Sequence, residues 1–152
     1  MCIRDRINSF TAHIGVGVMI IGVTYSSVYQ KEYNFNMKIG DEVAIENQLL
    51  EFDEIKIIDQ ENYQSLRAIF SLKNNDEIIS YIDPGKNYYP VSKMITTEAG
   101  IYHAWFKDIY ITLGSETNNL WFIKVYINPL VSFIWIGVFI MIFASLVAVI
   151  KK

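Results

Sequence analysis

Two long stretches of the chain contain only apolar and uncharged polar residues. Phe10–Tyr29 and Leu130–Ile150 hold no Asp, Glu, Lys or Arg, so all 13 basic and 16 acidic residues lie outside them. At about 1.5 Å per helical residue, each stretch spans roughly 30 Å, the thickness of the hydrocarbon core of a bilayer. The pattern predicts a transmembrane helix at 10–29 and another at 130–150, and it excludes a soluble domain with a single core.

The two predicted helices differ in character. The stretch 130–150 is apolar on every side, which is typical of a helix in lipid or in a helix bundle and not of a half-exposed helix. The first contains hydroxyl residues, one histidine and three glycines at Gly15, Gly17 and Gly22, and small residues let a second helix approach closely. We therefore expect the first helix to lie inside a helix bundle and the second to be more peripheral.

The 100 residues between the helices show the alternation and turn signals of β structure. We expect six to eight short strands in one small sheet or barrel, and an uncertain segment at 97–107 that could form a short helix. The fold class is then a membrane protein in which two transmembrane α-helices flank an all-β extracytoplasmic domain. The main signals are alternation at Phe35, Met37 and Ile39, a strand at 49–58 that breaks phase at Asp53-Glu54, and hairpin turns at 73–77 and 114–119.

Charge predicts the orientation of these parts. Arg4 and Arg6 precede the first helix and Lys151 and Lys152 follow the second, so the positive-inside rule places both ends in the cytoplasm. The middle carries 15 acidic and 9 basic residues, a formal charge of −6, and would lie on the outer side. The predicted organisation is a cytoplasmic segment 1–9, a helix 10–29, a periplasmic β-rich domain 30–129, a helix 130–150 and a cytoplasmic end 151–152.

Composition excludes several other classes of protein. The net charge of −3 gives no electrostatic reason to expect a nucleic acid as partner. Cys2 is the only cysteine, so the chain can form no internal disulfide and no Cys-based zinc site. A bundle helix with room for neighbours is an unusual way for a protein to begin, so we expect Met1 to be a non-native start and the chain to be the C-terminal piece of something larger.

His13 is the most informative single residue. It lies seven residues beyond Arg6, roughly 10 Å into the bilayer at about 1.5 Å per residue, where an ionisable side chain is costly and marks a functional site by default. His13, Gly17, Ile20 and Thr24 share one helix face, and a histidine beside a glycine leaves space for a flat macrocycle. The residues alone leave two interpretations open: a ligand of haem iron, or a histidine hydrogen-bonded to a neighbouring helix.

The remaining candidates favour structural interpretations. We expect His103, in an aromatic stretch, to be a surface or hydrogen-bonded histidine. Glu51, Asp53 and Glu54 could bind a cation, but strand alternation would scatter them over both faces of a sheet. Trp135 is typical of an interfacial anchor near the end of a membrane helix. No signature of a catalytic nucleophile is present, so we assign no catalytic residue.

Four segments, in order along the chain, resemble motifs of one family of haem-handling membrane proteins, the CcmF/CycK/NrfE family of cytochrome c maturation. Thr11–Gly15 resembles its A-H-[LI]-G motif at the head of a helix. The other three resemble M-x-T-E-A-x-I, [RK]-D-[LI]-Y-x-x-L-G and Y-x-x-P-[LF]-V-x-[WF]-I-W-x-G, and they are Met94–Ile101, Lys107–Gly114 and Tyr126–Gly137.

The resemblance implies the C-terminal part of a haem lyase subunit in the bacterial inner membrane, or less typically the mitochondrial one. By this resemblance His13 is an axial ligand of a membrane haem b, Gly17 packs against the haem, and the second axial ligand lies outside this chain. The implied partners are the haem chaperone CcmE, CcmH with related subunits, and apocytochrome c, to whose CxxCH cysteines the family joins haem by thioether bonds. The tryptophan-rich haem-handling segment is also absent here, so we expect this chain alone to be inactive.

A second hypothesis belongs to another class of function. A two-helix anchor that displays a β domain as a non-catalytic binding or assembly module would have the same topology. It would not account for His13 or for the four ordered motifs.

Overall fold

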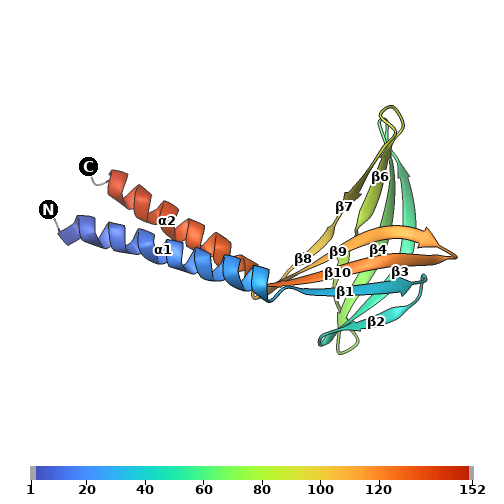
Figure 1. Ribbon diagram of the computed structural model, residues 1–152, viewed down its shortest axis with the longest axis horizontal. Coiled ribbons are helices and arrows are strands. Elements are labelled where there is room, and N and C mark those ends of the chain that lie inside the picture. The colour runs from blue at the N-terminus through green and yellow to red at the C-terminus, as the bar shows by residue number, and fades with distance from the viewer. Residues whose placement is uncertain (1–2, 151–152) are drawn as a thin grey trace. The chain divides into compact units, whose positions relative to one another are not determined.

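Two α-helices enclose ten β-strands along the described part of the chain, residues 3–150, in a computed structural model (Figure 1). Side chains are described from Ile7 onward. Met1, Cys2 and the predicted cytoplasmic end at 151–152 lie outside the described residues, as do the side chains of Arg4 and Arg6. The elements are α1 Ile3–Val28, β1 Lys31–Met37, β2 Glu42–Ile45, β3 Gln48–Asp59, β4 Gln64–Asn74, β5 Glu77–Ile82, β6 Gly85–Tyr89, β7 Met94–Glu98, β8 Gly100–His103, β9 Lys107–Thr117, β10 Leu120–Pro129 and α2 Val131–Ile150.

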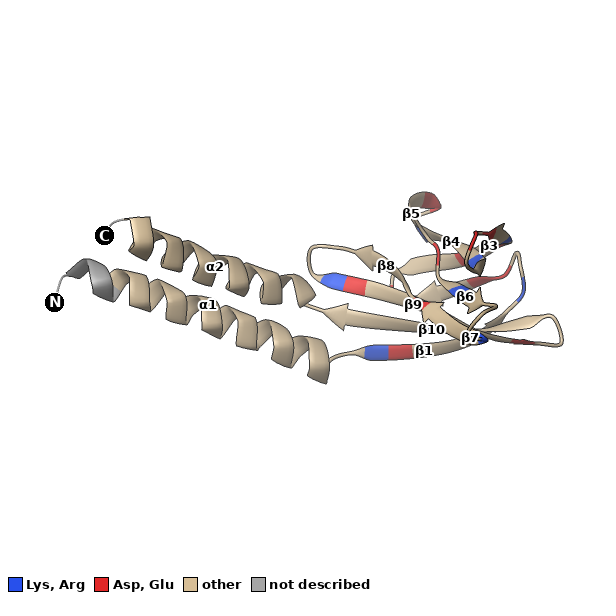
Figure 2. Ribbon diagram, turned by 90° about the horizontal axis from the view of Figure 1, so that it is seen from above, with Lys and Arg blue, Asp and Glu red and all other residues tan. Residues whose placement is uncertain are grey.

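The contacts divide the chain into two compact units. One contains both helices with residues 103–108 and the end of β10, and the other contains most of the strands. The predicted fold class, two apolar helices flanking an all-β domain, is confirmed. The portions Ile7–Val28 and Val131–Ile150 are long and apolar enough to cross a membrane. Figure 2 shows both portions without a charged residue, whereas the strands and their loops carry acidic and basic ones.

The strands form two sheets where the sequence pattern indicated one. The order is β1-β10-β9-β8 in the four-stranded sheet and β2-β3-β4-β6-β7 in the six-stranded sheet, with β5 also paired to β4. The short strands β2, β7 and β8 largely account for the excess over the predicted six to eight. The segment 97–107, where a short helix was considered, holds β8 and the ends of β7 and β9, and none of it is helical.

Most of the predicted turns and the predicted bulge are present. The register of β3 against β4 shifts between Phe52 and Glu54, as the phase break indicated. Asn75 and Asp76 have positive φ, 50° and 65°, in the tight turn of the β4–β5 hairpin. Ile39 was placed wrongly: β1 ends at Met37, and Ile39 is 55% exposed beyond it.

The core of the strand unit is built from alternate residues of both sheets. Phe52 and Phe70 stack with their ring centroids 4.7 Å apart, and neither is accessible to solvent. Apolar side chains of β9 and β10 complete the interior, namely Ile109, Ile111, Leu113, Ile123 and Val125. Burying each such side chain stabilises the fold by about 1.5–3 kcal/mol.

The two helices pack through glycine. A Cβ atom on Gly137 of α2 would lie 2.6 Å from the carbonyl oxygen of Gly15 and 2.6 Å from the amide nitrogen of Met19. Gly22 meets the backbone of Ile134 in the same way, at 2.7 Å. Gly17 does not belong to this contact, since a Cβ there would meet nothing within 4 Å. The prediction of close approach is therefore confirmed for Gly15 and Gly22, whereas Gly17 takes no part in the contact with α2.

This contact predicts the effect of adding one methyl group. Gly137→Ala would overpack the helix interface and lower the stability of the helix pair by about 1–3 kcal/mol. Thermal unfolding of the detergent-solubilised protein, followed by circular dichroism, measures the change. Gly17→Ala is the matched control and should leave the midpoint unchanged or slightly higher. Equal midpoints for Gly137→Ala and Gly17→Ala would contradict the close contact.

Candidate functional site

His13 lies on the side of α1 that faces away from α2. It is two positions from Gly15, about 200° around the helix at about 100° per residue, and Gly15 is the residue that touches α2. His13 is exposed, and so are Gly17, Ile20 and Thr24 on the same face. The structure thus brings the predicted pair His13 and Gly17 onto one open face. The second interpretation, a hydrogen bond from His13 to a neighbouring helix, is not observed among the described residues, where His13 is bonded to its own helix.

The His13 ring is oriented by its own helix. Its Nδ1 lies 2.6 Å from the carbonyl oxygen of Ser9, one turn earlier. A carbonyl oxygen can only accept, so Nδ1 carries the proton and donates it. In the neutral imidazole this leaves the lone pair on Nε2, which is the arrangement found in histidines that bind a metal through Nε2.

His13 and Gly17 therefore fit a planar iron macrocycle. The imidazole supplies a nitrogen ligand with a fixed tautomer, and Gly17 leaves the adjacent turn without a side chain. Groups of three or more His, Cys, Asp or Glu suited to a bare metal ion are absent from the part of the chain that the structure describes.

His103 has a partner that the sequence did not indicate. Its Nδ1 is hydrogen-bonded to Oδ2 of Asp108 at 2.9 Å, and Asp108 is only 3% exposed. The two residues stand on either side of a tight turn, in which the Ala104 amide donates to the Lys107 carbonyl at 3.0 Å. His103 is thus hydrogen-bonded, as expected, and its ring is tied to the end of a strand.

The carboxylates once considered for a cation are engaged in other contacts. Glu51 pairs with Lys73, which also binds Glu42 at 2.8 Å. The hydrogen bond from Lys73 lowers the pKa of Glu51, and the bonds to Glu42 and then Glu51 raise the pKa of Lys73. Glu54 instead pairs with Lys56 at 2.7 Å. These contacts favour a stabilising surface network over a cation site.

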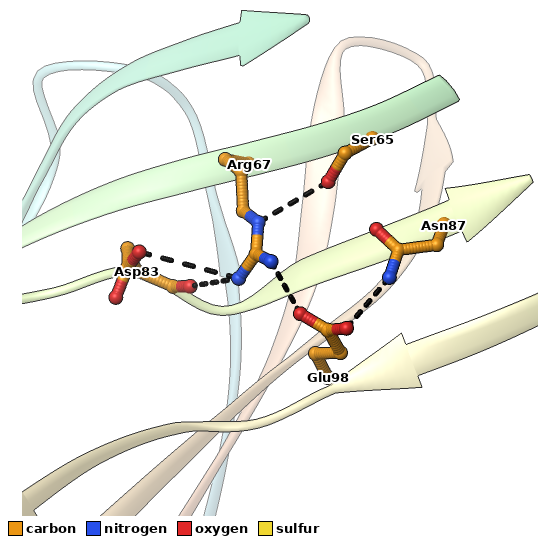
Figure 3. A network of polar contacts seen from close by, with 5 residues as sticks. All are labelled: Ser65, Arg67, Asp83, Asn87 and Glu98. Atoms are coloured by element: carbon orange, nitrogen blue, oxygen red, sulfur yellow. Dashed lines mark hydrogen bonds and ion pairs between the residues drawn. The ribbon is translucent and has the colours of Figure 1, made fainter. Parts of the chain in front are cut away.

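A second polar network joins three strands of the six-stranded sheet (Figure 3). Arg67 of β4 reaches Glu98 of β7 and the Asp83 carbonyl, the latter at 3.3 Å. Asn87 of β6 donates to the same Glu98 carboxylate at 2.6 Å. The Arg67 side chain passes over Gly85, where a Cβ would lie 2.7 Å from its Cδ. This network fastens the edge strand β7 to the sheet, and sequence reasoning missed it because its members are far apart in the chain.

Comparison with known proteins identifies the family. The model of the family described as "CcmF C-terminal beta-sandwich" matches residues 28–129. The chain belongs to this family. The resemblance drawn from the four motifs is thereby confirmed.

Individual CcmF proteins are similar over most of the chain. "Cytochrome c-type biogenesis protein CcmF" of Pseudomonas aeruginosa is 32% identical over 127 residues, covering 83% of the chain and 19% of that protein. The protein of the same name from Escherichia coli (strain K12) is 31% identical, with 83% and 20% covered. The chain thus spans about a fifth of the length of these relatives.

A solved structure shares the fold. "Cytochrome c Heme Lyase CcmF" superposes with a TM-score of 0.78 at 15% identity, covering 94% of this chain and 24% of that one. This solved structure therefore has the same fold as the chain, in which one helix precedes the β domain and another follows it.

The half-buried carboxylate of Asp53 predicts a pH effect on stability. Burial raises its pKa, one oxygen accepts from Ser71 at 3.1 Å, and the other is buried with no partner among the described residues. A carboxylate whose pKa is raised by folding destabilises the fold at neutral pH; this cost begins to decrease as pH falls through the folded pKa and is gone below the unfolded pKa. Asp53→Asn should therefore raise the unfolding midpoint by a few degrees at pH 7, with a smaller gain in acid.

Glu54→Gln is the control for this prediction, because Glu54 is exposed and pairs with Lys56. Calorimetric scans at neutral and acidic pH compare the two variants. A midpoint for Asp53→Asn below that of the parent at pH 7 would show that the charge is stabilising.

Proposed function

We propose that this chain is the C-terminal part of a membrane protein of cytochrome c-type biogenesis, and that it supplies one axial ligand to a haem b. The protein acts as a haem lyase subunit that joins haem to the CxxCH cysteines of apocytochrome c. Membership of the CcmF family and the names of its relatives support a role in this process. The observation that carries the role of this chain is the His13 imidazole on an open helix face, whose Nδ1–H donates a hydrogen bond to the Ser9 carbonyl oxygen.

In this proposal α1 and α2 cross the inner membrane and the β domain lies in the periplasm. The two helices run antiparallel, so the beginning of α1 and the end of α2 lie at the same end of the pair (Figure 1). That arrangement supports cytoplasmic ends for both segments, 1–9 and 151–152, and a single outer domain at 30–129. The organism class that fits is bacterial, as in the named relatives.

The residues of this chain would hold the haem from one side only. His13 binds the iron through Nε2, Ser9 fixes the ring, and Gly17 leaves room for the edge of the macrocycle. The haem supplies one-electron chemistry when bound, and the second axial ligand comes from outside this chain. The β domain handles apocytochrome and the partner subunits, including CcmE and CcmH. Its formal charge of −6 suits basic partner surfaces.

Replacement of His13 tests the ligand. In the complete protein that contains this chain, His13→Ala should lower the haem content and alter the absorption spectrum of what remains, because one axial ligand is lost. Pyridine haemochromogen assay and visible spectroscopy measure both. His103→Ala removes the other histidine of this chain and should leave them unchanged. A full haem complement with an unaltered spectrum in His13→Ala would refute the assignment and favour the non-catalytic anchor.

Gly17 provides an independent test of the same face. Gly17→Leu adds a side chain where the chain itself leaves open space, so the helix pair should fold normally. We expect less bound haem, because the added side chain occupies the position of the macrocycle, and an unchanged unfolding midpoint in the haem-free protein. Normal haem content in Gly17→Leu would mean that the macrocycle does not lie against this turn.

A further inference from the structure

Four exposed aromatic side chains gather at one end of the helix pair. They are Trp105 and Phe106, in the turn between β8 and β9, and Trp135 and Phe139, in the first turns of α2; we call them the aromatic collar. Their exposed fractions are 82%, 69%, 62% and 66%, respectively. Trp105, Trp135 and Phe139 line one hollow of about 340 Å³. Exposed apolar surface gathered in this way marks an interaction site.

The turn that carries half of the collar is fixed to the start of α2. The Leu130 amide donates to the Phe106 carbonyl at 2.8 Å, and the Phe133 amide donates to the Leu130 carbonyl at 3.0 Å. At the other side of the turn, His103 is bonded to the buried Asp108. Trp105 and Phe106 are therefore held level with the first turn of α2 and cannot fold back into a core.

Two tyrosines extend the aromatic surface on the other helix. Tyr25 and Tyr29, at the end of α1, stack with ring centroids 4.7 Å apart and are 45% and 56% exposed. They lie at the same end of the pair as the collar, because Gly22 of α1 touches Ile134 of α2. Aromatic side chains thus surround this end of the helix pair, and the helix surface beyond them carries no charge.

We propose that the aromatic collar lies in the headgroup layer of the membrane, with the turn 104–106 dipping into the lipid from the outer side. The indole rings of Trp105 and Trp135 favour this layer because they are apolar in body and polar at one edge, whereas the apolar phenyl rings of Phe106 and Phe139 favour its hydrocarbon side. The lipid surface is favoured as the partner because the collar is continuous with an apolar helix of membrane-spanning length. The inference rests on the proposed membrane crossing. It adds to the two helices a third segment that enters the membrane, the turn between β8 and β9, which the hydropathy of the sequence does not indicate.

The three tryptophans of the chain allow a direct test. Single-tryptophan proteins are made by changing the other two to Phe, which leaves Trp105, Trp121 or Trp135 as the sole fluorophore. The 152-residue chain is reconstituted without haem into phosphatidylcholine vesicles whose acyl chains carry bromine either close to the headgroup or near the chain end. Trp121 is the control, because it lies in β10, eight residues before the last residue of that strand, and belongs to the other compact unit of the chain.

Bromine close to the headgroup should quench Trp105 to the same extent as Trp135, and deep bromine should quench Trp105 less. Trp121 should be quenched by neither lipid. If Trp135 is quenched but Trp105 behaves like Trp121 and is quenched by aqueous iodide, the turn lies in water and this inference is overturned while the membrane crossing stands. If Trp105 is shielded from both bromine and iodide, the collar is covered by protein, which also overturns it. If Trp135 escapes quenching as well, both the crossing and the collar are wrong.

Discussion

The backbone contact between Gly15 and Gly137 determines how the helix unit is organised. Because neither residue has a side chain, the backbones of the two helices come into direct contact here. Helices that approach this closely gain dispersion contacts along their length, which is the main source of association when lipid is the solvent. The contact also fixes the rotation of α1 about its own axis. His13 and Gly17 point away from α2 as a direct geometric result, so the helix pair leaves one face of α1 for a further neighbour.

Much of the fold could be predicted from the sequence, because the strongest signals were local. The absence of charge from the two apolar stretches indicated the helices, and Asn75-Asp76 in a polar run indicated a hairpin turn whose positive φ angles suit Asn and Asp. Ile39 was misplaced because alternation alone cannot show where pairing stops. The number of sheets depends on pairing between strands distant in the chain, as with β1 beside β10, and no local pattern carries that information.

The candidate functional residues show the same difference: local signals could be detected in the sequence, and contacts between distant residues could not. His13 could be identified because a titratable residue in an apolar stretch is conspicuous, and Gly17 because it follows one turn later. The role of Gly17 differs from that of Gly15 and Gly22, yet all three look alike in the sequence, since only packing shows which side of the helix α2 covers. The pair His103 and Asp108 and the Arg67 network join charged residues to partners that a turn or a sheet register brings near. Such pairs have no fixed spacing.

The bond from His13 to Ser9 has an energetic consequence for any ligand that arrives. A free histidine side chain on a helix surface samples several χ1 and χ2 states, and binding would restrict them at an entropic cost. Here the restriction is already present, because the proton on Nδ1 ties the ring to the preceding helical turn. A metal centre that binds this imidazole would therefore lose less affinity to the ordering of the side chain, because one turn of α1 already holds the ring in place.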